Sequence, residues 1–213
     1  MSIDTRAPHG TRSGAWIPVG LILLGLIPVL GGAFRLTELA TSAADAPSRL
    51  ANDPLPVVLH AAFAIIYTLG GAFQLAPGLR RRRPRWHRAA GRVLVPAGLV
   101  VAVTGVWMVF SYDLFVVDGP LLASFRLGFG LAMAAAIVLG LLAVLRRDLS
   151  SHRAWMMRGY ALGLGAGTQA VVMIAWTATA GSLDELPRAL LHLTGWVVNL
   201  IVVEALLRRS PRG

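Results

Sequence analysis

The chain has 213 residues, a formal net charge of +10 and no cysteine. Hydrophobic residues make up 56% and charged residues only 14%, whereas soluble domains carry about 25% charged residues. This composition is typical of a protein built for lipid. The lack of cysteine excludes disulfides, thiolate metal sites, iron–sulfur clusters and covalently attached c-type haem. A cofactor would therefore be held by histidine, by carboxylate or by non-covalent packing.

Six stretches are apolar enough to cross a hydrocarbon core of ~30 Å, which takes a helix of ~20 residues. They are residues 16–34, 56–79, 93–112, 119–145, 159–183 and 189–207. Strands are disfavoured because the runs lack the two-residue alternation of a membrane barrel. We therefore predict an all-α fold, a polytopic transmembrane bundle with six spans. Residues 16–208 would form its single domain, between cytoplasmic tails at 1–15 and 209–213.

Arginine is distributed unequally among the predicted connections, and it is the only basic residue apart from histidine. Sixteen arginines lie in the N-terminal tail, the 80–92 loop, the 146–158 segment and the C-terminal tail. The three opposite connections carry only Arg35, Arg49 and Arg188. By the positive-inside rule we expect both termini in the cytoplasm of a bacterium and the spans in its inner, or plasma, membrane. The arginine-rich loops would then contact anionic lipid head groups, so the basic charge does not require nucleic acid.

A short motif occurs twice in the arginine-rich segments. "HRAAGR" begins at His87 and "HRAWMMR" begins at His152, and the two pairs of arginines before them keep the same offset of 65 residues. The pattern suggests an internal repeat, in which the second and third spans correspond to the fourth and fifth. Each copy would place a His-Arg pair at a helix start, where the helix dipole favours an anion such as phosphate.

Three runs carry a family resemblance: "LHAAFAIIYTLGGAFQLAPGLRRRRPRWHRAAGRVLV", "HRAWMMRGYAL" and "GWVVNLIVVEALL". Over residues 57–207 the chain resembles the bacterial multi-pass membrane family catalogued as domain of unknown function 2306. The resemblance implies an integral membrane protein of unassigned activity. Its signature would fall on His60, Gln74, His87, Arg88, Gly91, Arg92, His152, Arg153, Trp155, Arg158, Asn199 and Glu204. One departure is Gln169, which is the nearest polar residue to a position where the family leads us to expect arginine.

Polar residues within spans are costly and are therefore functional candidates. His60, Tyr67 and Gln74 recur every seven residues, so they share one helix face, as do His192 and Asn199. These residues, with Arg35 and Arg126, form the candidate cofactor-binding set. The candidate cytoplasmic cluster comprises His87, Arg88, Arg92, His152, Arg153, Trp155, Arg158 and Glu204. Within it Glu204 is expected to pair with Arg158, Arg88 or Arg92, because an unpaired buried charge is expensive.

The leading hypothesis is a membrane protein that binds haem b, or transfers electrons to a membrane redox partner. His60 and His192 would ligate the iron, and Arg35 or Arg126 would pair a propionate, provided that their helices are neighbours. A small-molecule or lipid transporter, a lipid-binding protein and an assembly partner of a membrane complex are the alternatives. Both histidines can also be read as interfacial hydrogen-bonding residues. The sequence shows no nucleophile-base pair or phosphate-binding loop, and whether the protein is an enzyme stays open.

Overall fold

The computed structural model describes residues 16–41, 52–180 and 183–209, and these are the residues discussed below. Its helices are α1 (Trp16–Thr41), α3 (Leu55–Gln74), α4 (Pro77–Arg82), α5 (Pro84–Ser111), α6 (Leu114–Val117), α7 (Pro120–Leu145), α8 (Leu149–Gly163), α9 (Gly165–Ala180) and α10 (Glu185–Arg209). The described part contains no strand. Six helical segments, with α8 and α9 taken together, are long and apolar enough to cross a membrane. The predicted all-α fold with six spans is confirmed.

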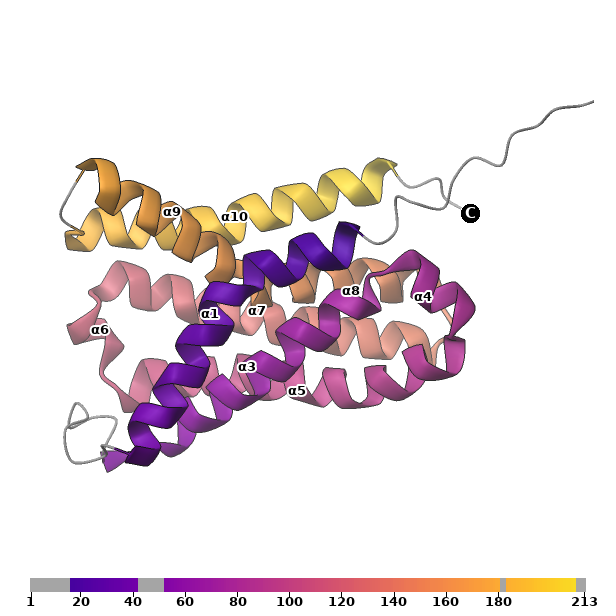
Figure 1. The fold of residues 1–213 in the computed structure, drawn as a ribbon, viewed down its shortest axis with the longest axis horizontal. Coiled ribbons are helices and arrows are strands. Elements are labelled where there is room, and N and C mark those ends of the chain that lie inside the picture. The colour runs from indigo at the N-terminus through magenta and orange to yellow at the C-terminus, as the bar shows by residue number, and fades with distance from the viewer. Residues whose placement is uncertain (1–15, 42–51, 181–182, 210–213) are drawn as a thin grey trace, which may run out of the picture.

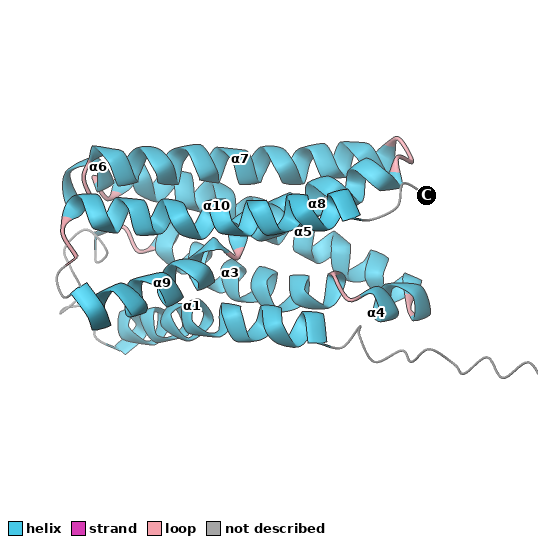
Figure 2. Ribbon diagram, turned by 90° about the horizontal axis from the view of Figure 1, so that it is seen from above, coloured by secondary structure: helices cyan, strands magenta, loops and turns pink. Residues whose placement is uncertain are grey.

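The long helices lie side by side and pack mainly with their neighbours in sequence (Figures 1 and 2). Thus α3 packs against α1 and α5, α5 against α7, and α7 against α8, while α10 packs against α7, α8 and α9. One end of the bundle holds α4, the starts of α5 and α8, and the end of α10; we call it the arginine-rich end. The other end, which holds α6 and the start of α10, is called the opposite end.

The core lies where α3, α5, α7 and α8 meet. Its buried side chains include Tyr67, Val101, Ile137 and Tyr160, one from each of these helices. In contrast, α1 and α10 each bury only 6% of their apolar 18-residue stretch inside the protein. These two helices therefore present most of their apolar surface to the surroundings, as lipid-facing helices do.

Glycines allow close packing in the glycine-rich run at residues 161–170. The helix there is broken: α8 ends with a cap at Leu164, and α9 begins at Gly165. A Cβ built at Gly167 would lie 2.3 Å from the carbonyl oxygen of Leu24 in α1, and one at Gly165 would lie 2.5 Å from the Trp196 ring. Only glycine lets both neighbours approach so closely.

The structure corrects several expected boundaries. The 56–79 span ends at Gln74, and α4 begins at Pro77, because proline disfavours helix in the residue before it. The expected 80–92 loop is largely helical, since it comprises α4 and the first turns of α5. The 146–158 segment mostly belongs to α8. Part of the long 35–55 connection lies outside the described residues, and α1 continues through Thr41.

Candidate functional site

His60 lies on α3 with its ring against α5. Its Nδ1 is 3.0 Å from the carbonyl oxygen of Val101 and 3.1 Å from Thr104 Oγ1. The Thr104 hydroxyl donates its proton to the Val100 carbonyl, at 2.6 Å, and a carbonyl only accepts. The proton of a neutral His60 is therefore assigned to Nδ1, as the hydrogen-bond network requires. This tautomer leaves a lone pair on Nε2, to which no hydrogen bond is assigned among the described residues.

His60 also lines a slot of about 220 Å³ between α1 and α3, here called the α1/α3 slot. The slot runs from Arg35 and Val57 near the opposite end to Thr68 and Leu164 at mid-bundle. Val57 and Thr68 are about 16 Å apart along α3 at a rise of 1.5 Å per residue. The remaining walls are apolar or small and come from α1, α3, α5, α8 and α9: Pro28, Val29, Gly32, Ala61, Ala64, Ile65, Val101, Gly163 and Ala166.

The other two polar residues of the predicted α3 stripe have different surroundings. Tyr67 is only 3% exposed, and its buried hydroxyl has no hydrogen-bond partner among the described residues. Its ring lies 5.8 Å from that of Tyr160, centroid to centroid. Gln74 donates from Nε2 to the carbonyl oxygen of His87, at 3.1 Å. The stripe therefore does not line one cavity, and of its three members only His60 lines the slot.

His192 is engaged within its own helix. Its Nδ1 is 2.8 Å from the Arg188 carbonyl oxygen, and its ring lies 6.4 Å from that of Trp196. Asn199 lies about two turns further along the same face of α10. Its Nδ2 donates to the carbonyl oxygen of Ala161 at 3.0 Å. The helices that pack on α10 are α7, α8 and α9, and His192 does not line the α1/α3 slot. The structure thus shows no shared site for His60 and His192, and their joint ligation of haem stays a prediction.

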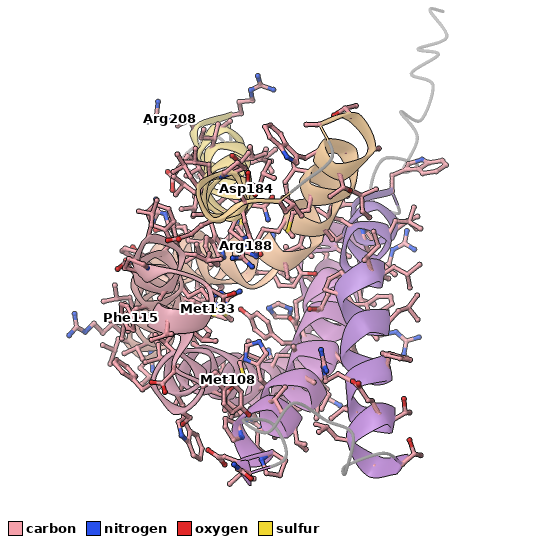
Figure 3. All side chains as sticks on the ribbon, turned by 90° about the vertical axis from the view of Figure 1, so that its left-hand side faces the viewer. Met108, Phe115, Met133, Asp184, Arg188 and Arg208 are labelled. Atoms are coloured by element: carbon pink, nitrogen blue, oxygen red, sulfur yellow. The ribbon has the colours of Figure 1, made fainter. Side chains whose placement is uncertain are left out.

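The predicted anion-pairing arginines already have carboxylate partners. Arg126 on α7 pairs with Asp118, and Arg188 Nη1 lies 3.8 Å from the same carboxylate. Arg188 is on the inner side of α10, whereas Arg208 projects outward from the same helix (Figure 3). Arg35 pairs with Glu38 at 2.8 Å. Sequence reasoning missed Asp118, whose position eight residues before Arg126 is the only signal that could have indicated the pair.

At the arginine-rich end, Glu204 pairs with one of its three predicted partners. Arg158 donates from Nε to Oε1 at 2.6 Å and from Nη2 to Oε2 at 3.1 Å, which is a bidentate contact. The Arg158 guanidinium also lies 4.7 Å from the Trp155 ring centroid. In contrast, Arg92 is exposed and Gly91 has open space where a side chain would begin.

The two predicted His-Arg motifs begin helices at equivalent positions. His87 is the fourth residue of α5, and His152 is the fourth residue of α8. The first residues of these helices, Pro84 and Leu149, are 65 positions apart, as are the motifs. The correspondence concerns the helix starts, and the larger hairpin repeat stays a prediction. His152 Nδ1 is 2.8 Å from the Gly140 carbonyl oxygen, which fixes the ring.

Six helical segments are long and apolar enough to cross a membrane, and both ends of the bundle carry polar groups. Together these features define a multi-pass integral membrane protein. The chain belongs to the family described as "Predicted membrane protein (DUF2306)", which it matches over residues 57–207. The match includes α4 to α9, α3 without its first two residues and α10 without its last two, while α1 lies outside it. No curated protein and no solved structure matches the chain.

Proposed function

We propose that this protein binds a narrow, membrane-soluble amphiphile in the α1/α3 slot, through a head group that donates a hydrogen bond to His60. The observation that carries the proposal is that His60, whose Nε2 has no hydrogen-bond partner among the described residues, lines a mainly apolar slot. A polar group without a partner in an apolar environment costs free energy, about 1–3 kcal/mol. A ligand that supplies a donor recovers this cost.

The remaining features of the slot narrow the ligand class. Arg35, at one end, keeps N–H donors beyond the one that it gives to Glu38. A hydroxyl can donate to His60 and accept from Arg35, so it satisfies both polar groups. The volume of 220 Å³ lies below the range of about 300–1,000 Å³ that is usual for pockets of drug-sized ligands. An elongated slot of this size suits an alkyl or isoprenoid chain that ends in an alcohol or quinol group.

Haem b is the alternative that one observation favours, because a neutral imidazole with a free Nε2 is also an iron ligand. The size of the slot argues for the narrower ligand. Absorption spectra of the purified protein decide between the two. A Soret band that disappears in both His60→Ala and His192→Ala would establish haem and displace the amphiphile proposal.

Photo-crosslinking in vesicles tests the amphiphile. The probe is a long-chain alcohol with a diazirine in its tail, and the control probe is its methyl ether, which cannot donate a hydrogen bond. We expect the alcohol to label α1 and α3 about fivefold more than the ether, because one hydrogen bond contributes roughly 1 kcal/mol. His60→Leu should abolish this difference.

His192→Leu is the matched variant, since it removes a histidine of the opposite end that does not line the slot. It should label like the unsubstituted protein. Equal labelling by alcohol and ether in the unsubstituted protein, or crosslinks confined to other helices, would contradict the proposal.

A further inference from the structure

We infer that the α1/α3 slot takes a ligand with a chain of about ten atoms and excludes longer chains. The reason is that Gly25, Thr68 and Leu164 close the inner end of the slot, which is the end at mid-bundle, away from Arg35. This inference deepens the proposed function and rests on it, since it names the size class of the ligand for the same slot.

The first step concerns how α1 and α3 approach each other. The two helices contact each other and run in opposite directions (Figure 1). Gly32 faces Ala61, because a Cβ built at Gly32 would lie 3.7 Å from the Ala61 Cβ, an ordinary contact. Gly25 faces Thr68, and a Cβ built at Gly25 would collide with the γ-methyl group of Thr68. The two helices are therefore packed more tightly at Gly25 than at Gly32.

The second step is that this tight contact ends the slot. Thr68 and Leu164 line the slot and are only 7% and 5% exposed. A Cβ built at the buried Gly25 would also lie 3.5 Å from Leu164 Cδ1. The next residue of α1 towards the arginine-rich end, Leu24, has its backbone against Gly167 of α9. A chain that reaches Thr68 and Leu164 therefore meets packed groups.

Hydrogen bonds hold this end wall in place. The Tyr160 hydroxyl donates to the carbonyl oxygen of Thr68 at 2.8 Å, which ties α3 to α8. Leu164 is the C-cap of α8, and its N–H donates to the carbonyl oxygen of Tyr160 at 2.8 Å. Because both wall residues are fixed through the same tyrosine, the wall cannot easily move aside for a longer chain.

The length of the slot gives the size of the chain. The head group binds at His60, and Thr68 lies eight residues further along α3, which is about 12 Å at a rise of 1.5 Å per residue. An extended chain advances roughly 1.2 Å per bond. The slot therefore has room for a linear chain of about ten atoms, or for an isoprenoid of about two units.

Chain length should affect binding mainly through this limit. Transfer of a methylene group from the bilayer to an apolar slot gains little free energy, because lipid tails are as apolar as the side chains of the slot. Alcohols shorter than the limit should therefore compete equally at equal mole fraction in the membrane. Longer alcohols should compete less, because their extra atoms must displace packed groups.

The test is competition between linear alcohols and the photo-crosslinking alcohol, which is used here with a decyl chain in phosphatidylcholine vesicles. The competitors are octanol, decanol, tridecanol and hexadecanol, compared at equal mole fraction in the membrane. We expect octanol and decanol to compete equally. Tridecanol and hexadecanol should compete at least about tenfold more weakly, in line with the usual cost of overpacking.

Variants of the end wall should move the limit. Leu164→Ala removes Cγ and both Cδ atoms from the wall, so the limit should rise by about three chain atoms, and tridecanol should then compete as decanol does. Leu162→Ala is the matched control, because it removes the same atoms from the same helix at a residue that is 6% exposed and does not line the slot. It should leave the limit unchanged.

A variant in the opposite direction keeps the inference testable if Leu164→Ala does not fold. Ala64 lines the slot one turn after His60, at about 6 Å along α3. Ala64→Leu should therefore reduce the limit to about five chain atoms. The decyl probe should lose its advantage over its methyl ether in this variant, whereas a pentyl probe should keep it. Circular dichroism should show the same helix content in all three variants.

Failure of this inference is distinguishable from failure of the proposed function. Equal labelling by the alcohol and its ether in the unsubstituted protein would overturn the proposed function and this inference with it. A retained difference, with hexadecanol competing as well as decanol, would overturn this inference alone, because the chain would then leave the slot sideways. An equal shift of the limit in Leu164→Ala and Leu162→Ala would also overturn the assignment of the end wall.

Discussion

Asp148 shows how one side chain organises the start of α8, the helix that carries the second His-Arg motif. It is the N-cap of α8, where its carboxylate accepts from the Ser151 backbone N–H at 3.0 Å and from the Ser150 hydroxyl at 2.7 Å. Hydrogen bonds from Ser151, and then from Ser150, lower the pKa of this carboxyl to about 2. A lowered pKa means that the ionised form stabilises the folded state.

The direction of the pH dependence follows from this shift. The stabilisation is complete above the ordinary aspartate pKa of about 3.9 and is lost as the pH falls toward 2. Asp148→Asn keeps a capping oxygen and removes the charge. Thermal unfolding should therefore occur at a lower temperature in this variant at pH 7, and the difference should disappear near pH 2. A difference of the same size at both pH values would contradict the assignment.

Residue types and spacing indicated which polar side chains form specific contacts. They were a poorer guide to the residues that these side chains contact. The depth of Glu204 in its span predicted an arginine partner, and the structure supplies Arg158. The eight-residue spacing of Asp118 and Arg126 did not specify their pairing, because the contact depends on how α6 folds back against α7. The contact of His60 with Thr104 likewise depends on the packing of α3 on α5.

At the scale of elements, hydropathy located all six spans because each is a long uninterrupted apolar run. Hydropathy could not locate the polar ends of these helices. Residues 80–92 read as a loop because they are charged, yet arginine is a good helix former and Pro84 occupies a first-turn position where proline is tolerated. Charge therefore marked the membrane boundary, whereas the helices continue beyond it.

The glycines of α9 provide a prediction at this scale. Gly167→Ala would place a Cβ against the backbone of Leu24, which cannot move aside as a flexible side chain can. We expect the free energy of unfolding to fall by about 1–3 kcal/mol, the usual cost of overpacking. Gly128→Ala in α7 is the matched control, because its Cβ would meet nothing within 4 Å. Reversible unfolding in mixed micelles measures both, and equal stabilities would contradict the packing of α1 on α9.

At the scale of the molecule, the number of spans and the grouping of arginines were accessible from sequence, whereas the neighbours of each helix were not. The haem hypothesis needed the helices of His60 and His192 to be adjacent. In the structure, the helices on α3 include α1, α5 and α8, while those on α10 include α7, α8 and α9. Packing among apolar helices depends on small residues such as Gly165 and Gly195, whose partners no periodicity specifies.

The orientation of the bundle is the last prediction, and the chain is suited to its test because it has no cysteine. The connections of the arginine-rich end and the two tails carry sixteen arginines, against three in the connections of the opposite end. By the positive-inside rule we predict that the arginine-rich end faces the cytoplasm. Val116, on α6 at the opposite end, is 83% exposed, and Ser150 is exposed near the start of α8. In intact cells, a membrane-impermeant maleimide should label Val116→Cys and leave Ser150→Cys unmodified until the membrane is opened. Labelling of Ser150→Cys alone in intact cells would reverse the orientation and would place the arginine-rich end outside the cell.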